Sequence, residues 1–399
     1  MTGFGWTYLS RDALRRAEAQ LDGETAGVRD EIGFLLIHQR YADRFFPGTS
    51  VLHTRLRYVL FVPWMYEDLR RGPPVRSVAR AVEQAEVDIA GRLKARGSGA
   101  GVIGGLKHPE PTSQPPSVVY WTALGAWGLL RPRSNGRPPA RARVHAALQA
   151  EKRVATDDDG LPLREAEFPF ITLPPPPEEW RARKDLRFDL APKEAEFLSA
   201  RLRAVASPED PARPSLFARL AERGVPDTAF CWSGEVLEVA EQDRAALVRA
   251  GQAASLAAIG RGVYAALVEE IRDTGDGRAT SRRHRDTLPG VVEAHQKAAL
   301  RLNLHSLLED VNGLPDVVVA VLTETIGWLR TGAKDPSTLR GAYAAAELAR
   351  KRQRARLTDD LSGRERRLEW DNARHTLAEP LHFRWGNVHR LLSDLRGLA

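Results

Sequence analysis

The chain has 399 residues, 43% of them hydrophobic and 28% charged, a balance that indicates a folded protein of two or three domains and excludes disorder of the whole chain. Its single cysteine, Cys231, excludes an internal disulfide framework and a zinc site built on several thiolates, and no stretch approaches 18 uninterrupted apolar residues. The formal net charge of +7 and an N-terminus without a signal-peptide pattern lead us to expect a cytoplasmic protein with an anionic partner and no membrane span.

The positive charge is carried almost wholly by arginine, because only 8 of the 59 basic residues are lysine. Arginine can hold a phosphate with two parallel hydrogen bonds, which favours nucleic acid as the partner. Alanine, glycine and proline are also abundant, as codon bias in a GC-rich genome would produce. The arginine excess therefore has both a functional and a compositional explanation.

Four helices are predicted in the first hundred residues. Their expected positions are after Ser10, at 28–46, after Thr49 or Ser50, and at 75–95. Pro63 should kink or interrupt the third of them, because proline lacks a backbone donor and crowds the preceding turn.

A glycine- and proline-rich loop is expected at 96–117, followed by a buried strand or short helix at 118–130. Four consecutive prolines, Pro174–Pro177, cannot continue a helix and form a stiff spacer. We therefore predict a mainly α, multi-helical fold of two domains, with a small irregular or strand-containing segment near residues 96–175. The predicted domains are 1–175 and 189–399, with a proline-rich boundary at 176–188.

The second half of the chain is predicted to be helical throughout. Pro192 suits the first turn of one helix, where its missing donor is harmless. Apolar residues recur at helical spacing in two stripes, at 256–271 and 300–311, with Gly260 and Gly262 placed beside the first for close packing. A turn at 312–315 should lead into a core helix at 317–329.

The catalytic motifs that a basic protein suggests are incomplete. Gly99, Gly101 and Gly104 match a dinucleotide-binding pattern but lack its strand and helix, so a loop is favoured. No lysine has an acid two residues before it, as a common class of metal-dependent nuclease requires. His295 and Lys297 begin a phospholipase-D-like motif, but Leu302 stands where its aspartate belongs. We expect no metal and no cofactor, and enzyme is the less favoured class, although an unrecognised active site stays open.

Two other features are interpreted as structural. The acidic run at 157–160 lacks the spacing of a calcium loop and is expected to be a solvated turn. Cys231, between Phe230 and Trp232, is expected to be a small buried apolar residue.

Three segments concentrate positive charge. The densest holds Arg350, Lys351, Arg352, Arg354 and Arg356, continued by Arg364, Arg366 and Arg367. The second holds Arg282, Arg283 and Arg285, and the third is 131–153. On a continuous helix Arg350 and Arg354 would share one face, so the densest segment needs an anionic partner, acidic neighbours or only water. Contacts with phosphate would give salt-sensitive, sequence-independent binding, whereas a charge run can also be a solvated face.

Short motifs along the whole chain resemble a family of uncharacterised bacterial and archaeal proteins of about this length. They are Phe4–Trp6, Phe46–Ser50, Thr54–Trp64, Pro116-Ser117, Tyr120-Trp121, Trp127-Gly128 and Phe383–Trp385. The resemblance implies an association with anti-phage defence loci, near helicases and phospholipase-D-like nucleases. Arg55 and Arg57 lie inside the strongest motif and either hold a buried acid, such as Asp43 or Glu67, or contact phosphate.

The favoured hypothesis is a non-catalytic, DNA-associated subunit of a multi-gene bacterial anti-phage defence system, with no membrane contact. It would bind nucleic acid non-specifically and dock a helicase or nuclease partner. One alternative is an interaction scaffold or sensor without nucleic-acid contact. The other is a nucleic-acid enzyme with an unrecognised active site.

Overall fold

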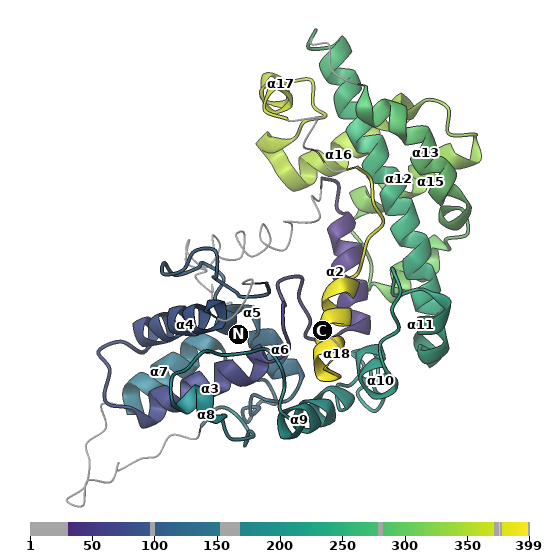
Figure 1. Cartoon of the computed structure of the whole chain (residues 1–399). Coiled ribbons are helices and arrows are strands. Elements are labelled where there is room, and N and C mark those ends of the chain that lie inside the picture. Colours follow the sequence, from purple (N-terminus) through teal and green to yellow (C-terminus); the bar gives the residue numbers. More distant parts are fainter. Residues whose placement is uncertain are drawn as a thin grey trace, which may run out of the picture. The chain divides into compact units, whose positions relative to one another are not determined.

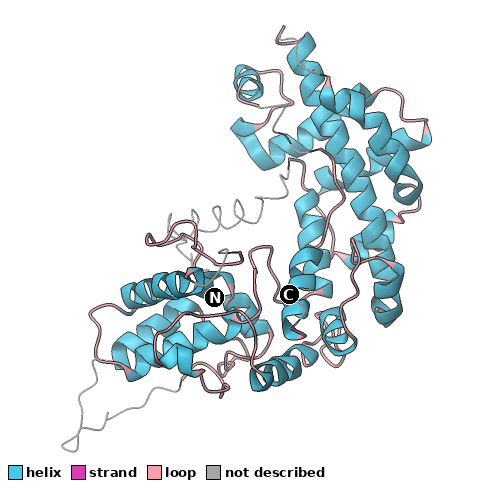
Figure 2. Ribbon diagram, viewed as in Figure 1, coloured by secondary structure: helices cyan, strands magenta, loops and turns pink. Residues whose placement is uncertain are grey.

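The computed structural model describes residues 31–95, 100–151, 168–277, 282–370, 375 and 377–397. These residues form 17 α-helices and three short 3₁₀ helices (Figure 2). Strand-like pairing among them is limited to two isolated bridges, Leu130 with Phe170 and Ala206 with Pro214. The mainly α prediction is confirmed, and the first bridge lies inside the predicted irregular segment. The helix expected after Ser10 and the acidic turn at 157–160 lie outside the described residues.

The chain divides into two compact units, each built from separate stretches of sequence. Of the described residues, the first unit takes 43–227 and 384–397, and the second takes 31–42 and 228–383. Helix α2 (Phe34–Phe45) contains one of the points at which the chain passes between them. This division does not follow the predicted boundary at 176–188, which falls within the first unit.

The proline run is part of the first unit's packing. The indole nitrogen of Trp64 donates to the Pro174 carbonyl at 2.9 Å, and that of Trp180 donates to the Asp68 carboxylate at 2.8 Å. The Trp180 ring is stacked on Phe61, 5.6 Å between centroids. A stiff extended segment anchored by two tryptophans covers a core surface, so it does not separate two domains.

Nine further helices belong to the first unit (Figure 1). They are α3 (Tyr58–Arg71), α4 (Val78–Lys94), α5 (Pro116–Val119), α6 (Trp121–Ala126), α7 (Arg141–Glu151), α8 (Glu178–Arg181), α9 (Pro192–Arg203), α10 (Leu216–Arg223) and α18 (Trp385–Leu395). The core is centred on α3, whose residues Tyr58 to Tyr66 are all buried. The stretch at 118–130, predicted as a strand or short helix, is mostly helical as far as Ala126 and ends in the bridge at Leu130, and Pro192 starts α9 as expected.

Helix α3 differs from its prediction at both its start and its middle. The expected N-cap at Thr49 or Ser50 is absent, because the Thr49 hydroxyl donates back to the Phe46 carbonyl at 2.7 Å in a turn and the helix begins at Tyr58. Pro63 lies inside α3 without interrupting it. Its neighbours are all buried, so tertiary packing outweighs the local cost of a proline.

The second unit is organised around α12 (Arg244–Thr274), a 31-residue helix with α13 (Arg283–Ala299) packed along it (Figure 1). The other helices of this unit are α11 (Gly234–Val239), α14 (Leu304–Asp310), α15 (Asp316–Arg330), α16 (Arg340–Lys351) and α17 (Leu361–Leu368). The 3₁₀ helices are η1 (Glu241–Asp243), η2 (Pro336–Leu339) and η3 (Arg352–Arg354).

The predicted stripe at 256–271 is buried on α12 as expected. Gly260 lies against Phe34, where an added Cβ would stand 2.5 Å from the ring, so the predicted close packing is confirmed at that position. The stripe at 300–311 is not one helix, because α13 ends before Leu300 and α14 starts at Leu304. Leu300 is exposed, whereas Leu307 and Val311 are buried. The turn at 312–315 and the helix after it are present, and Cys231 is buried as expected.

Candidate nucleic-acid interface

The densest basic segment is not a continuous helix. Helix α16 ends at Lys351, and Arg352 adopts a positive φ of 51°, followed by the single turn η3 and the buried Ala355. The expected face shared by Arg350 and Arg354 therefore does not form. The change of direction is enforced by Ala355 and Leu357, which turn inward to join the core.

Lys351 and Arg356 are held inside the second unit. Both pair with Glu31, which is 6% exposed. The backbone N–H groups of Arg356 and Leu357 each donate to the Glu347 carboxylate at 2.8 Å, and the Tyr264 hydroxyl donates to the same carboxylate at 2.6 Å. Burial raises the pKa of Glu347. These contacts make Lys351 and Arg356 parts of a buried polar network.

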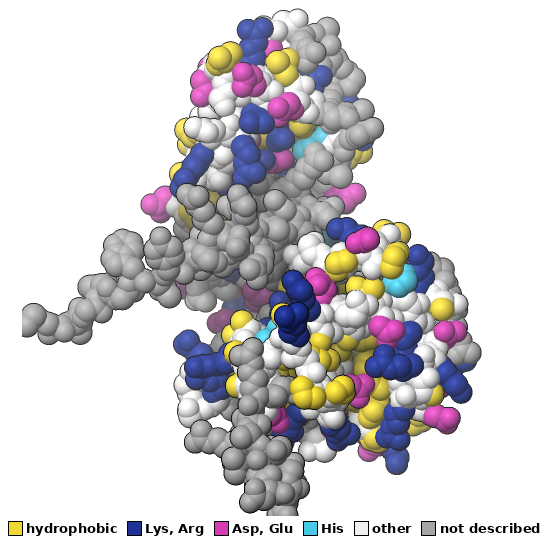
Figure 3. Space-filling model, turned by 90° about the vertical axis from the view of Figure 1, so that its left-hand side faces the viewer, with side chains coloured by type: hydrophobic (Ala, Val, Ile, Leu, Met, Phe, Trp, Pro, Cys, Tyr) yellow, Lys and Arg dark blue, Asp and Glu magenta, His cyan; other side chains and the backbone are white. Residues whose placement is uncertain are grey.

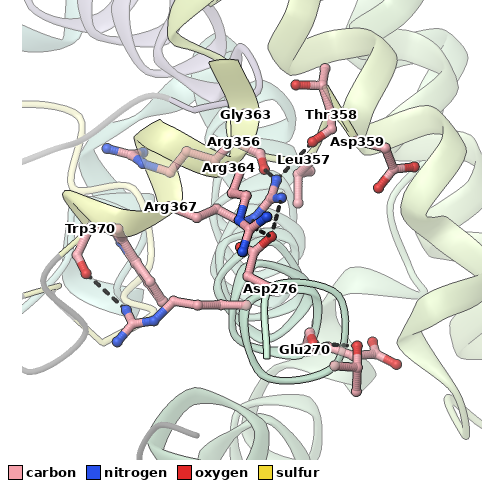
Figure 4. A network of polar contacts seen from close by, with 12 residues as sticks. Glu270, Asp276, Arg356, Leu357, Thr358, Asp359, Gly363, Arg364, Arg367 and Trp370 are labelled. Carbon is pink, nitrogen blue, oxygen red and sulfur yellow. Dashed lines mark hydrogen bonds and ion pairs between the residues drawn. The ribbon is translucent and has the colours of Figure 1, made fainter. Parts of the chain in front are cut away.

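The continuation of the segment is also structural (Figure 4). The Arg367 guanidinium, 3% exposed, forms two hydrogen bonds with the Asp276 carboxylate, at 2.7 and 2.9 Å. It also donates to the carbonyl oxygens of Arg356 and Thr358, at 2.5 and 2.7 Å. Arg367 holds the pKa of Asp276 below its usual range. The side chain thereby ties α17 to the end of α12.

Arg352 and Arg354 behave differently. Both are exposed, and their side chains make no hydrogen bond or ion pair with any residue that the structure describes. Arg350 is also exposed but has a partner. Of the five residues predicted to bind nucleic acid in this segment, only Arg352 and Arg354 thus present an unengaged guanidinium.

The second basic segment is largely paired. Arg285 forms ion pairs with Glu269 and Asp273, and its backbone N–H donates to the fully buried Glu269 at 2.9 Å. Arg282 pairs with Asp286 on the surface, 3.3 Å between nitrogen and oxygen. Arg283 is half-buried at the start of α13. An exposed pair such as the one at Arg282 could open for a phosphate, but a buried one could not without cost to the fold.

Arg55 and Arg57 are engaged with acids, but not with those that the sequence suggested. The Arg55 guanidinium forms a forked pair with Asp394, with distances of 2.7 to 3.0 Å, and Arg57 pairs with Glu194 at 2.8 Å. The suggested Asp43 and Glu67 pair instead with Arg384 and Arg71. The strongest sequence motif therefore links the start of α3 to α18 and α9. Its predicted contact with phosphate stays a prediction.

The third basic segment has the most unengaged arginines of the three. Arg133, Arg137 and Arg143 are exposed, and none of their side chains makes a hydrogen bond or ion pair within the described part of the chain. Arg131 and Arg143 line a hollow of about 210 Å³ beside Phe168. The nearest acid along this stretch, Glu151, is already paired with Arg70 at 2.9 Å.

The sequence itself distinguishes the third basic segment, whose arginines are mostly unpaired, from the densest one. Residues 131–150 contain five arginines and no Asp or Glu, whereas the segment from Arg350 to Arg367 contains Asp359, Asp360 and Glu365. Counting positive charge alone ranks the segment from Arg350 first as a surface for an anion. Counting acids as well ranks 131–150 first.

Positive charge on the surface is divided among several separate groups of side chains. On the face shown in Figure 3, Lys and Arg side chains form separate groups with Asp and Glu between them, not one continuous stripe. Among the described residues no group of His, Cys, Asp and Glu side chains is arranged to hold a metal ion, and no helix is long and apolar enough to cross a membrane. The molecule is thus a multi-helical protein with patches of unpaired arginine on an otherwise mixed surface.

The whole chain matches one known family. Residues 1–398 match the model of a family of unknown function (DUF6361), and the chain belongs to that family. This agrees with the resemblance to an uncharacterised family of about 400 residues. Comparison with curated proteins and with solved structures gave no match.

Proposed function

We propose that this protein is a non-catalytic, nucleic-acid-binding subunit, and that the arginines at 131–143 are its main contact with DNA. The observation that carries the proposal is that Arg133, Arg137 and Arg143 are exposed on a stretch without acids and have no partner among the described residues. Arg352 and Arg354 add a second, smaller contact.

Carboxylates of the protein compete with phosphate for its arginines. An arginine paired with a carboxylate must give up that pair before it can hold a phosphate, so its net gain is smaller than that of an unpaired arginine by the stability of the pair, about 0.2–1 kcal/mol for an exposed one. An unpaired guanidinium offers all its N–H donors to a phosphate at once and releases condensed counterions when it binds. Contacts of this kind recognise the nucleic-acid backbone and carry no sequence information of their own.

The proposal is tested by a triple variant with a matched control. The variant is Arg133→Gln, Arg137→Gln and Arg143→Gln; the control is Arg71→Gln, Arg213→Gln and Arg366→Gln, three surface arginines already paired with Glu67, Asp210 and Glu369. Both remove three positive charges. We expect affinity for a random DNA duplex to fall about 10-fold or more in the variant and much less in the control. An equal fall in both would show that only net charge matters, and would contradict a dedicated contact.

The place in a defence system and the helicase or nuclease partner are proposed on the resemblance of the sequence motifs alone. Isolation of the chain at native level from its own cells, with identification of what co-purifies, tests this part. Recovery of a helicase or nuclease encoded beside it supports the proposal. If such a partner is recovered but the purified chain shows no affinity for DNA or RNA, the scaffold alternative replaces it.

A further inference from the structure

The hollow of about 210 Å³ beside Phe168 lies within the first unit, between α7 and the stretches 131–139 and 168–169. Most of its wall is apolar. Three prolines line it together with two buried side chains of α7 and one aromatic ring: Pro132, Pro139, Pro169, Val144, Leu148 and Phe168. The hollow is therefore an apolar slot in the middle of the arginine-rich stretch.

The one acid in this wall is neutralised within the protein. Glu151 Oε1 accepts a hydrogen bond of 2.9 Å from Arg70 Nε, and its side chain is 15% exposed. Two of the three arginines that line the hollow, Arg133 and Arg143, are exposed, and their side chains make no hydrogen bond or ion pair within the described part of the chain. Among the described lining residues, no unpaired carboxylate thus competes for an anion beside the hollow.

The Phe168 ring is held in a fixed position. The third lining arginine, Arg131, donates from its backbone N–H to the Pro169 carbonyl at 2.8 Å and from Nε to the Phe170 carbonyl at 3.0 Å, which ties the two flanking stretches together. The ring also packs against Phe170, 5.4 Å between centroids, and the Arg70 guanidinium lies over it at 5.6 Å. A half-buried ring fixed in this way gives a flat surface against which a planar group can lie at small entropic cost.

The size and charge of the hollow indicate what fits it. Sites for whole small molecules usually measure about 300–1,000 Å³, so this hollow suits one planar ring system better than a complete nucleotide. Exposed arginines border it, so the ring should be attached to anionic groups that stay outside. A base of a nucleic-acid strand has this form, with a flat face for stacking and phosphates on either side. Bases inside a duplex are already stacked and paired, so only an unpaired base can enter.

We propose that the hollow takes one unpaired base of single-stranded DNA, and that the arginine surface therefore prefers a single strand to a duplex. The base lies against Phe168 and the prolines, while Arg133 and Arg143 bind the phosphates beside it. This inference rests on the proposed nucleic-acid contact and adds to it the form of DNA that is bound. A duplex still binds, but through its phosphates alone.

The test is fluorescence anisotropy of the full chain with three probes of about 20 nucleotides: a thymidine strand, a strand that carries no bases, and a duplex. We expect the thymidine strand to bind at least about 10-fold more tightly than the baseless strand, because the two share every phosphate and differ only in the bases that stack. It should also bind more tightly than the duplex, although the duplex has the denser charge.

The outcomes separate this inference from the proposal on which it rests. Equal affinity for the two single strands, or tighter binding of the duplex, would overturn the base-binding hollow and leave the arginine contact standing. Binding of none of the three probes would contradict both.

A matched pair of variants that leaves every charge in place locates the site. Ala147 is exposed on α7 and lines the hollow, so Ala147→Leu adds three carbon atoms to that space. It should weaken binding of the thymidine strand about 10-fold and leave duplex binding unchanged. The control Ala146→Leu, at the next exposed alanine, should change neither. Equal effects of the two substitutions would contradict the proposal.

A second variant tests the aromatic ring. Phe168→Leu keeps an apolar side chain but removes the flat surface, so the preference for the thymidine strand over the baseless strand should fall to about 3-fold or less. A thermal melt confirms that the protein is folded. An undiminished preference in the folded variant would equally overturn the proposal.

Discussion

Arginine has two distinct roles in this molecule, and burial decides between them. Arg57 and Arg367 are buried, and each guanidinium binds a carboxylate and at least one backbone carbonyl oxygen. Arg133 and Arg354 are exposed and have no partner that the structure describes. Removing an arginine of the first kind leaves a buried acid unpaired, whereas removing one of the second kind leaves only solvent.

This contrast predicts very different stabilities for two chemically identical substitutions. Arg367→Gln should lower the free energy of unfolding by about 3 kcal/mol, because Asp276, whose side chain is 5% exposed, would keep only the longer ion pair with Arg364 at 4.0 Å. Arg354→Gln, 13 residues earlier in the same basic segment, should change it by less than about 0.5 kcal/mol. Urea denaturation of the two variants measures both values. Similar small changes in both would show that the pair with Asp276 contributes nothing.

Glu86 gives a pH-dependent prediction. Its pKa is raised from 4.5 to about 7 in the folded protein, so folding favours the protonated form. The stability from this group is complete below pH 4.5 and is lost as the pH rises through 7. Glu86→Gln removes the buried charge and keeps an oxygen for the Ser117 N–H.

Glu86→Gln should therefore exceed the wild type in free energy of unfolding at pH 8 by up to about 3 kcal/mol, and the advantage should shrink steadily towards pH 5. Unfolding curves of both proteins at the two pH values measure the difference. Other titrating groups, such as His53, are present in both proteins, so their contributions cancel in the difference between the two free energies of unfolding. An advantage that grows towards pH 5 would contradict the assigned shift.

At the scale of the element, helical periodicity predicted where apolar faces lie better than where helices end. The stripe on α12 and the core helix α15 were predicted from spacing alone, because a buried face leaves its period in the sequence. The start of α3 and the end of α16 were missed. The start of α3 is set by a contact 338 positions away, in which the Leu56 N–H donates to Asp394, and no local pattern encodes it. The turn after α16 is held closer by, because the Leu357 N–H donates back to the buried Glu347 carboxylate 10 positions earlier.

The packing of α12 makes a prediction at this scale. Gly260→Ala should destabilise the protein by about 1–3 kcal/mol, because the new Cβ would lie 2.5 Å from the Phe34 ring in a core without spare space. Gly327→Ala on α15 meets nothing within 4 Å and should stabilise by up to about 1 kcal/mol. Thermal melts of the two variants give the sign directly. Destabilisation by both, or by neither, would contradict the close approach of Phe34.

At the scale of the whole molecule, the sequence predicted the class of fold but not how the units are assembled. Each unit combines stretches that are distant in the chain, and the proline-rich run predicted as a boundary falls within the first unit. The candidate interface, too, could be predicted only in part from the sequence. Charge density is visible in the sequence, but the pairing of Arg367 with Asp276 joins residues 91 positions apart and cannot be counted locally. The absence of acids at 131–150 could be read from the sequence, because it needs no pairing information.

The most direct test of the nucleic-acid proposal is the salt dependence of DNA binding, measured by filter binding on a random duplex. Each phosphate contact contributes about 0.9 to the negative slope of log affinity against log salt concentration. If Arg133, Arg137 and Arg143 contact phosphates, replacing all three by glutamine should make this slope shallower than that of the wild type by about 2 to 3. The control, in which Arg71, Arg213 and Arg366 are replaced, should keep nearly the wild-type slope. Identical slopes for all three proteins, or no salt-dependent binding by the wild type, would contradict the account.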